Sequence, residues 1–295
     1  MVAQILPGTN TPHRWHVDDV PYERIRRETI ADNDLYFYLV TTASFIEITS
    51  DIYTRNLIEY YAGDEVIADW LNTTWEPEEL QHGTALKRYV QTVWPEFDWE
   101  SAYRDFQEDY SRFCKVELLG PTRALEMAAR CVVEMGTCSY YTMLHRGSPE
   151  PVLADITRNI RTDEAYHYKH FYEFFLRYQS HHNTGRWPIF KTLVGRIAEI
   201  DSEDGMIAIK HVWRHRHPGK TYRDDHYRAI SKAVRGLAQA HYPYRMAANM
   251  TMKPLRLPHR LQTPAEHAVA AGARLYTRIT GTEPGQLASA ADSAV

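Results

Sequence analysis

The chain has 295 residues, enough for one large domain with a single core or for two smaller domains. Its hydrophobic fraction of 44% and charged fraction of 24% are ordinary for a folded protein and argue against general disorder. The net charge of −4 gives no overall reason to expect a nucleic acid or an anionic membrane surface as a partner.

Cysteine usage and hydropathy favour a cytoplasmic protein. Cys114, Cys131 and Cys138 are odd in number and lack paired spacing, so a disulfide framework is not expected. The N-terminal residues have neither a basic start nor an apolar run of signal length. No stretch approaches the about 20 apolar residues that a membrane span requires. We therefore predict a cytoplasmic chain that does not span a membrane.

The spacing of apolar residues predicts helices throughout, after an irregular arm over residues 1–30. A first long helix is expected from Ala31 to about Tyr61, where Ala62-Gly63-Asp64 provides a break. A second long helix is expected from about residue 65 to residue 93. Pro77 lies inside this second segment, so it either marks a helix boundary or kinks a continuous helix near a functional site.

Shorter and longer helical segments alternate in the rest of the chain. They are expected at 98–113, 122–146, 149–180, 188–200, 206–215, 222–240 and 264–278, with a Pro-rich loop around 243–263. Because the four longest segments lie in the first 180 residues, we predict an all-α fold with a four-helix bundle and additional C-terminal helices. Residues 31–240 then form the main domain, residues 241–280 a loop and a helix packed on it, and residues 281–295 a disordered tail.

Two Glu-x-x-His motifs, Glu79–His82 and Glu164–His167, place a carboxylate and an imidazole on one face of a helix. With 21 Glu and 15 His among the 295 residues, chance supplies roughly one such pair, so the motifs alone decide little. Their position is more informative. They fall on the second and the fourth of the four long helices, one motif on each.

The other two long helices each offer one glutamate in a mostly apolar stretch, Glu47 and Glu134. A carboxylate on the buried face of a helix is costly unless it is paired or binds a metal. Glu47 precedes Glu79 by 32 residues and Glu134 precedes Glu164 by 30, which suits a helical hairpin that returns to the same height. We therefore predict a two-metal site held by Glu47, Glu79, His82, Glu134, Glu164 and His167.

On these residues the chain resembles the ferritin-like di-iron carboxylate superfamily over roughly residues 30–180. Within that superfamily it is most similar to the soluble acyl carrier protein desaturases. Glu78-Glu79-Leu-Gln-His82-Gly83, with the following Leu86-Lys87-Arg88-Tyr89, is similar to their second ligand helix. Asp163-Glu164-x-x-His167 resembles the fourth, and Glu134-Met-Gly-Thr137 follows the pattern of a threonine one turn after the third-helix ligand. The resemblance does not extend to the C-terminal hundred or so residues.

The resemblance implies a non-haem di-iron oxidoreductase that uses O2 as co-substrate, with two Fe ions or a Mn/Fe pair. The substrate would be an apolar small molecule or an acyl chain on a carrier protein, and electrons would come from an external donor such as a ferredoxin. A homodimer is compatible with this class. Two residues would support the site: Asp163 by holding a ligand histidine and Thr137 by helping to deliver protons. Each could instead be an ordinary helical residue.

Three other interpretations remain open at this stage. The first is a di-iron N-oxygenase or hydroxylase of a small metabolite. The second is an iron-storage or peroxide-detoxifying protein, and the third is a metal-free helical scaffold.

A basic stretch over residues 209–235 includes His211, His215 and His217. It could dock an acidic carrier protein or electron donor, could bind a metal through its histidines, or could be a solvated helix face.

Overall fold

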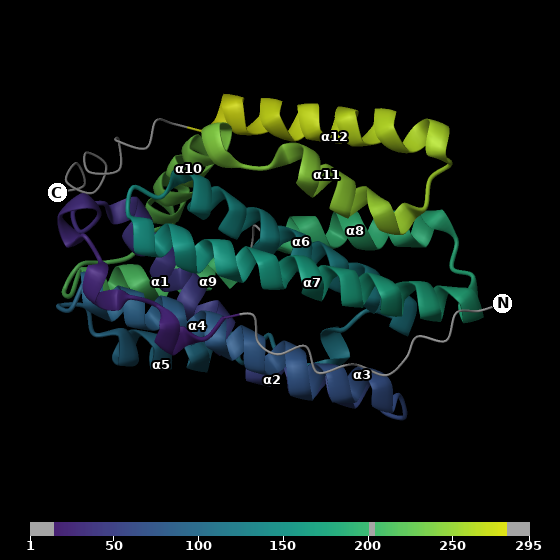
Figure 1. Ribbon diagram of the computed structural model, residues 1–295, viewed down its shortest axis with the longest axis horizontal. Helices are drawn as coiled ribbons and strands as arrows, with labels where there is room; N and C mark the ends of the chain where they lie inside the picture. The colour runs from purple at the N-terminus through teal and green to yellow at the C-terminus, as the bar shows by residue number, and fades with distance from the viewer. Residues whose placement is uncertain (1–14, 201–203, 282–295) are drawn as a thin grey trace.

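The computed structural model describes residues 15–200 and 204–281 (Figure 1). Within these residues the secondary structure is helical and contains no strand, which confirms the predicted all-α class. No helix in the described part of the chain is both long enough and apolar enough to cross a bilayer.

Four long helical rods form the centre of the molecule. The first comprises α1 (Asp34–Ile48) and α2 (Ser50–Tyr60), and the second comprises α3 (Glu65–Trp70), the π-helical turn η4 (Leu71–Trp75) and α4 (Glu76–Val93). The third and fourth are α6 (Arg123–Gly147) and α7 (Pro151–His182). The helices pack mainly as two pairs, α1 against α4 and α6 against α7, with α4 also contacting α7.

Shorter helices surround this centre. They are α5 (Trp99–Tyr110), α8 (Arg186–Ile200), α9 (Asp204–Arg216), α10 (Asp224–His241), α11 (Tyr244–Met252) and α12 (His259–Thr280). Helices α5 and α9 pack together beside α1, whereas α8 and α11 pack on α6. Helix α12, drawn in yellow, contacts α10 and α11 and lies across the molecule from α2 and α3 (Figure 1).

Polar side chains cap the N-termini of the long helices. The side chain of Asn33 accepts a hydrogen bond from the backbone N–H of Tyr36 at the start of α1. Thr122 does the same for α6, and Glu150 accepts a 2.8 Å bond from Leu153 N at the start of α7. These caps satisfy backbone donors that the first helical turn leaves without partners.

The prediction of a single helix over residues 31–61 is wrong at Thr49, which separates the end of α1 from the beginning of α2. The side-chain hydroxyl of Thr49 donates to the carbonyl oxygen of Phe45 at 2.8 Å. Its backbone N–H bonds instead to Ile46, three residues back, at 3.1 Å. The hydroxyl therefore competes for the carbonyl that an unbroken helix would use, and the break falls two residues after Glu47.

Pro77 does not end a helix. The chain remains helical from α3 to α4, and the distortion is a π-helical turn, Leu71–Trp75, which ends two residues before the proline. Of the two interpretations of Pro77, the continuous helix is the one found. Such turns widen the helix by one residue and are frequent beside functional sites.

The Pro-rich region around 243–263 is not the expected loop. It contains α11 and the beginning of α12, because its prolines stand at helix boundaries. Pro243 and Pro258 occupy the N-cap positions of these two helices, and Pro254 lies in a short 3-10 turn that follows α11. A proline at or just before the first turn breaks no helical hydrogen bond, so it begins a helix as readily as it ends one.

The described part of the N-terminal arm, residues 15–30, is irregular as predicted, with three short 3-10 turns over Val17–Asp19, Tyr22–Arg24 and Arg27–Thr29. Partly buried side chains of this segment, including Trp15 and Tyr22, pack on the core. Residues 1–14 and the predicted tail, apart from Gly281, lie outside the described residues.

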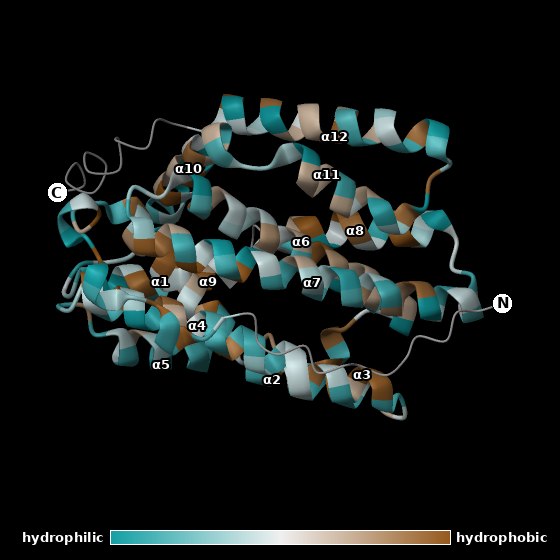
Figure 2. Cartoon of the chain, in the orientation of Figure 1, coloured by the Kyte–Doolittle hydropathy of each residue, from teal (hydrophilic) through white to brown (hydrophobic). Residues whose placement is uncertain are grey.

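The apolar core consists of two clusters of buried side chains. One lies among α1, α4, α5, α9 and α10 and contains Phe37, Trp94 and Phe106. The other lies among the π-helical turn, the first half of α6 and the second half of α7, and contains Trp75 and Phe171. Figure 2 shows hydrophobic residues along α1 in the interior, while α5 is largely hydrophilic on its visible face.

Candidate metal centre

Six side chains from the four long rods meet in the interior and form two overlapping groups. In the first group, ligand atoms of Glu47, Glu79, His82 and Glu164 all lie within 4.8 Å of one another. In the second group, the same holds for Glu79, Glu134, Glu164 and His167. These are the six residues predicted from the sequence, and two of them, Glu79 and Glu164, belong to both groups.

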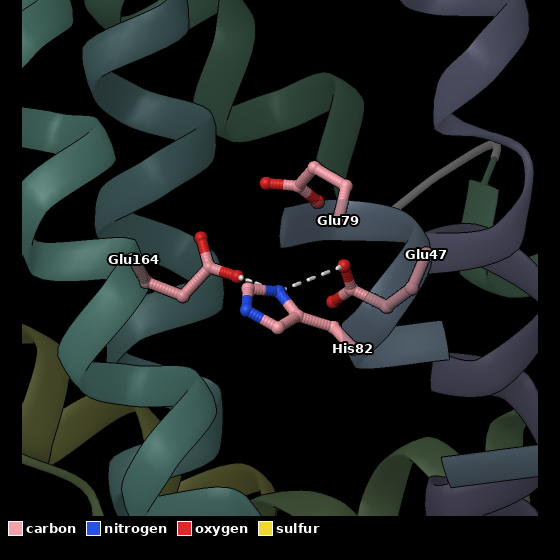
Figure 3. Close-up of side chains that lie close together, drawn as sticks. All are labelled: Glu47, Glu79, His82 and Glu164. Atoms are coloured by element: carbon pink, nitrogen blue, oxygen red, sulfur yellow. Dashed lines mark ion pairs between the residues drawn. The ribbon is translucent and has the colours of Figure 1, made fainter. Parts of the chain in front are cut away.

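Figure 3 shows how three of the helices contribute to the first group. Glu164 approaches from α7 on one side and Glu47 from α1 on the other, with Glu79 and His82 of α4 between them. The Nδ1 atom of His82 lies 3.2 Å from Glu164 Oε1 and 3.7 Å from Glu47 Oε2. Because Glu79 and His82 are three residues apart, one face of α4 presents both side chains.

The second group takes Glu134 from α6 and His167 from the Glu164–His167 motif of α7. His167 Nδ1 lies 3.0 Å from Glu79 Oε1, 3.5 Å from Glu134 Oε2 and 3.6 Å from Glu164 Oε2. Each histidine thus directs Nδ1 toward the carboxylates.

The cluster is almost completely withdrawn from solvent. No member is more than 7% exposed, and His82 and Glu164 are fully buried. The only ion pairs of these four carboxylates among the described residues are with His82 and His167. Four buried carboxylates without Lys or Arg partners leave negative charge to be neutralised, by protons or by a bound cation.

Several inward-facing atoms of the cluster have no hydrogen-bond partner among the described residues. They are His82 Nδ1, His167 Nδ1, Glu134 Oε2 and Glu164 Oε1. Buried polar atoms are rarely left in this state, and bound ions are one of the recognised explanations. Carboxylate oxygens and imidazole nitrogens are donors that suit Fe and Mn, so the residues present fit a two-metal site.

The pKa values of the cluster residues reflect their burial and the contacts between carboxylates and histidines. Burial raises the pKa of Glu134 to about 8 and, together with the neighbouring Glu164, raises the pKa of Glu79 well above its ordinary value. Burial alone would lower the pKa of His82, but its hydrogen bonds to carboxylates, first of all Asp163, raise that pKa well above the usual range. Burial acts to raise the pKa of Glu164, but the two histidines close to its carboxylate outweigh burial and lower that pKa.

The outward nitrogens of the two histidines are held by acids from the opposite motif. His82 Nε2 lies 3.1 Å from Asp163 Oδ2, and His167 Nε2 lies 2.8 Å from Glu78 Oε2. Asp163 was predicted to hold a histidine, and the structure pairs it with His82. The role of Glu78 was missed, although it precedes Glu79 as Asp163 precedes Glu164. This repeated acid-Glu-x-x-His pattern is the sequence feature that could have indicated the role of Glu78.

Trp15 of the N-terminal arm completes this outer layer on one side. Its indole Nε1 donates a 2.7 Å hydrogen bond to Asp163 Oδ2, and its ring is stacked on His82 with centroids 6.2 Å apart. A chain of hydrogen bonds therefore runs from a half-buried indole through Asp163 to His82. No sequence pattern pointed to Trp15.

Two hydroxyl groups bind the carboxylates directly. Thr137 Oγ1 lies 2.8 Å from Glu164 Oε2 and so can donate to it, besides contacting the carbonyl oxygens of Val133 and Glu134 in its own helix. The hydroxyl of Tyr141 donates to Glu47 Oε1. The predicted position of Thr137 beside the site is thus found.

Cys138, which lies near the cluster, is not part of either group. Its thiol is hydrogen-bonded to the carbonyl oxygen of Arg161, and burial raises its pKa to about 12. The thiol is thus hydrogen-bonded to the backbone of α7 and contributes no ligand atom to either group.

The basic stretch on α9 binds acidic side chains of this chain. Lys210 Nζ and His211 Nε2 lie 2.6 and 2.8 Å from Asp109 Oδ2, and His215 Nε2 lies 2.9 Å from Asp105 Oδ2. Both acids belong to α5, so these contacts fix α9 against α5. In the described chain the three histidines over 211–217 form no metal-binding group.

Comparisons with known proteins give no family. No model of a protein family matches the chain, and no curated protein matches it.

Proposed function

We propose that this chain is a ferritin-like di-metal carboxylate protein in which Glu79 and Glu164 bridge two metal ions. The observation that carries the proposal is the convergence of two four-residue groups that share these two glutamates. One metal would be held by Glu47 and His82 with the bridges, and the other by Glu134 and His167 with the bridges. Four carboxylates balance the charge of two divalent ions.

For the activity, we propose an O2-dependent oxidoreductase of the desaturase or monooxygenase type. Iron bound in this site supplies the redox chemistry toward O2 that amino-acid side chains lack. The chain's residues serve that chemistry by position. Asp163 and Glu78 orient the two histidines, and Thr137 holds a hydroxyl proton against Glu164 Oε2.

The class of substrate and the electron donor are part of the same proposal. An apolar substrate, free or attached to an acyl carrier, and an external donor of the ferredoxin kind are supported by the resemblance over residues 30–180. The hydrogen-bonded series Trp15–Asp163–His82 supports a route for electrons, because it connects the partly exposed arm to the site.

The first test is the metal content of the full-length protein. Protein loaded anaerobically with Fe(II), freed of excess metal and analysed by mass spectrometry should hold two Fe per chain, one for each group. Protein that holds no Fe or Mn after loading would contradict the proposal.

The second test is turnover in air. The reduced, loaded protein is incubated with acyl-carrier-protein thioesters, free fatty acids and aryl amines, and the products are identified by mass spectrometry. Oxidised acyl products are expected. Oxidation of the amines alone would favour the N-oxygenase alternative, and consumption of O2 with every substrate unchanged would favour storage or detoxification.

A further inference from the structure

Helix α12 lies along one edge of the molecule, and the rest of the described chain covers it on one side only (Figure 1). It packs mainly against α10 and α11. On the covered side Ala270 is buried, and Thr277 Oγ1 is hydrogen-bonded to the hydroxyl of Tyr244 at 2.5 Å. None of the six cluster residues belongs to these three helices, so the proposed metal chemistry does not explain the uncovered side of α12.

The uncovered side of α12 carries an apolar stripe. Its largest members, Leu261, Leu275 and Ile279, are 57%, 57% and 72% exposed. Val269 and Tyr276, which border the stripe, are exposed as well. A contiguous row of exposed apolar side chains marks a contact surface, whereas scattered single ones do not. The stripe follows alternating intervals of four and three residues, which keep to one face of a helix, and consists of Leu261, Ala265, Ala268, Gly272, Leu275 and Ile279.

A row of cations runs along one border of this stripe. Arg260, His267, Arg274 and Arg278 are all exposed and recur at intervals of seven, seven and four residues. None of the three arginines forms an ion pair with another described residue. The one acid of the helix, Glu266, faces inward and accepts hydrogen bonds of 2.9 and 2.7 Å from side chains of α11 and α12. The exposed side of α12 is therefore apolar and cationic.

The charge of the surrounding sequence acts in the same direction. Residues 244–281, which contain α11 and α12, hold six Lys or Arg residues and one acid, whereas the whole chain has 34 Lys or Arg residues and 38 acids. The overall net charge of −4 therefore conceals a basic C-terminal segment in an otherwise acidic chain. Such a charge asymmetry favours an anionic partner.

The stripe and its cations fit a lipid surface better than a protein. A second copy of α12 packed on the first adds another row of cations and no exposed acid to balance them. In the middle of the stripe, Ala265, Ala268 and Gly272 offer a protein groove no large side chain to fill a pocket. A bilayer surface needs no such anchor, because its headgroup region adapts to the helix. Anionic headgroups also supply the missing counter-charges.

We propose that α12 binds the surface of an anionic lipid bilayer. The helix lies parallel to the surface over its length of about 33 Å, with the apolar stripe at the boundary of headgroups and acyl chains and the three arginines at the phosphates. This is attachment to one leaflet and not a span, in agreement with the absence of a membrane-spanning helix from the described chain. The attachment is independent of the proposed metal centre.

The test measures partition of the full-length protein onto lipid vesicles by sedimentation, at near-physiological ionic strength. One set of vesicles is phosphatidylcholine alone, and the other is an equal mixture of phosphatidylcholine and phosphatidylglycerol. Partition onto the mixed vesicles should be about a hundredfold stronger, since each of the three arginines contributes about fivefold near an anionic surface. Raising the salt concentration should release the protein, because exposed charges are then screened.

Two double variants of exposed residues separate the cationic contribution from the apolar one. Arg274→Gln/Arg278→Gln should weaken partition onto the mixed vesicles about 25-fold, with the same factor of about five for each arginine. Leu275→Ser/Ile279→Ser keeps every charge and should weaken partition at least about tenfold, because two apolar side chains no longer enter the bilayer.

The matched control is Arg104→Gln/Arg112→Gln, which removes two exposed arginines from α5 and the residues just after it. Helix α5 lies at the opposite edge of the molecule from α12 in Figure 1. This variant has the same net charge as Arg274→Gln/Arg278→Gln and should bind vesicles as the unmodified chain does.

Equal partition onto neutral and mixed vesicles, no partition onto either, or partition that the α12 variants leave unchanged would overturn the proposal. Sedimentation velocity without lipid tests the other occupant of the stripe. A dimer of the unmodified chain that Leu275→Ser/Ile279→Ser dissociates would overturn the proposal in favour of self-association. None of these outcomes bears on the proposed di-metal site, which the metal content of the protein tests separately.

Discussion

His82 and Asp163 come from different helices, yet Nε2 of the one lies 3.1 Å from Oδ2 of the other. The same relationship is repeated between His167 and Glu78 at 2.8 Å. Each acid is the residue before a cluster glutamate on its own helix and holds the histidine of the opposite helix. Helices α4 and α7 are therefore joined twice across the site, and each imidazole is fixed with Nδ1 directed inward.

Asp163→Asn should weaken metal binding about 10- to 100-fold, because a metal-bound imidazole loses the carboxylate that orients it. Glu78→Gln should give a loss of similar size. Competition with a coloured chelator measures both affinities. Glu173→Gln changes a partly exposed residue of α7 whose one ion pair among the described residues is with Lys169; it is the matched control and should bind metal as the unmodified chain does. An unchanged affinity in both variants of the acid–histidine pairs would show that these contacts have no role in binding.

Glu134→Ala should abolish metal occupancy in at least one of the two sites. Glu134 belongs to the second group only, so the site built around Glu47 and His82 keeps all its side chains. Metal analysis should therefore give about one ion per chain in place of about two. Glu173→Ala serves as the control. Full occupancy in the Glu134 variant would contradict the assignment of this residue as a ligand.

Gly83→Ala should destabilise the protein, because the backbones of α1 and α4 lie close together at this glycine. A Cβ atom at Gly83 would lie 2.7 Å from the backbone N of Ile48 and 2.4 Å from its Cγ1. Overpacking of this kind costs about 1–3 kcal/mol of the free energy of unfolding. Denaturant titration measures the change.

Gly272→Ala in the exposed helix α12 provides a matched comparison with the Gly83 variant. Apart from its chain neighbours and the nearby backbone of its own helix, no atom of the described residues lies within 4 Å of its added Cβ. This substitution should stabilise the protein by about 0.5–1 kcal/mol, because alanine favours a helix. Equal effects of the two substitutions would contradict the close approach of α1 and α4.

The metal-free protein should lose stability as the pH rises from about 6 to about 9. Burial raises the pKa of Glu134 from 4.5 to about 8, so the folded state holds this proton more tightly than the unfolded chain does. The stability from this proton is complete below pH 4.5 and is lost as the pH rises through about 8. The raised pKa values of His82 and His167 act in the same direction.

Thermal unfolding of chelator-treated protein across this pH range measures the effect. The variant Glu134→Gln should show a smaller decrease, because a neutral amide has no proton to lose. Metal-loaded protein should show the opposite trend, since protons compete with the metal for the same atoms. A metal-free protein whose melting temperature rises steadily toward pH 9 would contradict the electrostatic account.

The sequence was sufficient to predict the helical class, the positions of the long helices and the six clustered residues. These follow from local spacing, because a Glu-x-x-His pair needs only one helix face to bring its side chains together. The break at Thr49 was not predicted, since it depends on which of two donors reaches the carbonyl of Phe45. The partner of Asp163 could not be chosen either, because that depends on how α4 and α7 are rotated about their axes. The α11 segment was missed because its flanking prolines were interpreted as interrupting helices.

The π-helical turn Leu71–Trp75 has a consequence for how the chain tolerates changes of length. It winds one residue more than an α-helical turn into nearly the same rotation about the helix axis. Removing a single residue from this turn and restoring α-helical winding would therefore leave α3 and the Glu79–His82 face of α4 in nearly the same angular relation. The same deletion in an α-helical part of the rod would turn its two ends against each other by about 100°. The π-helical turn is thus the place in this rod where the chain can change its length by one residue with the least effect on the direction of the two cluster side chains.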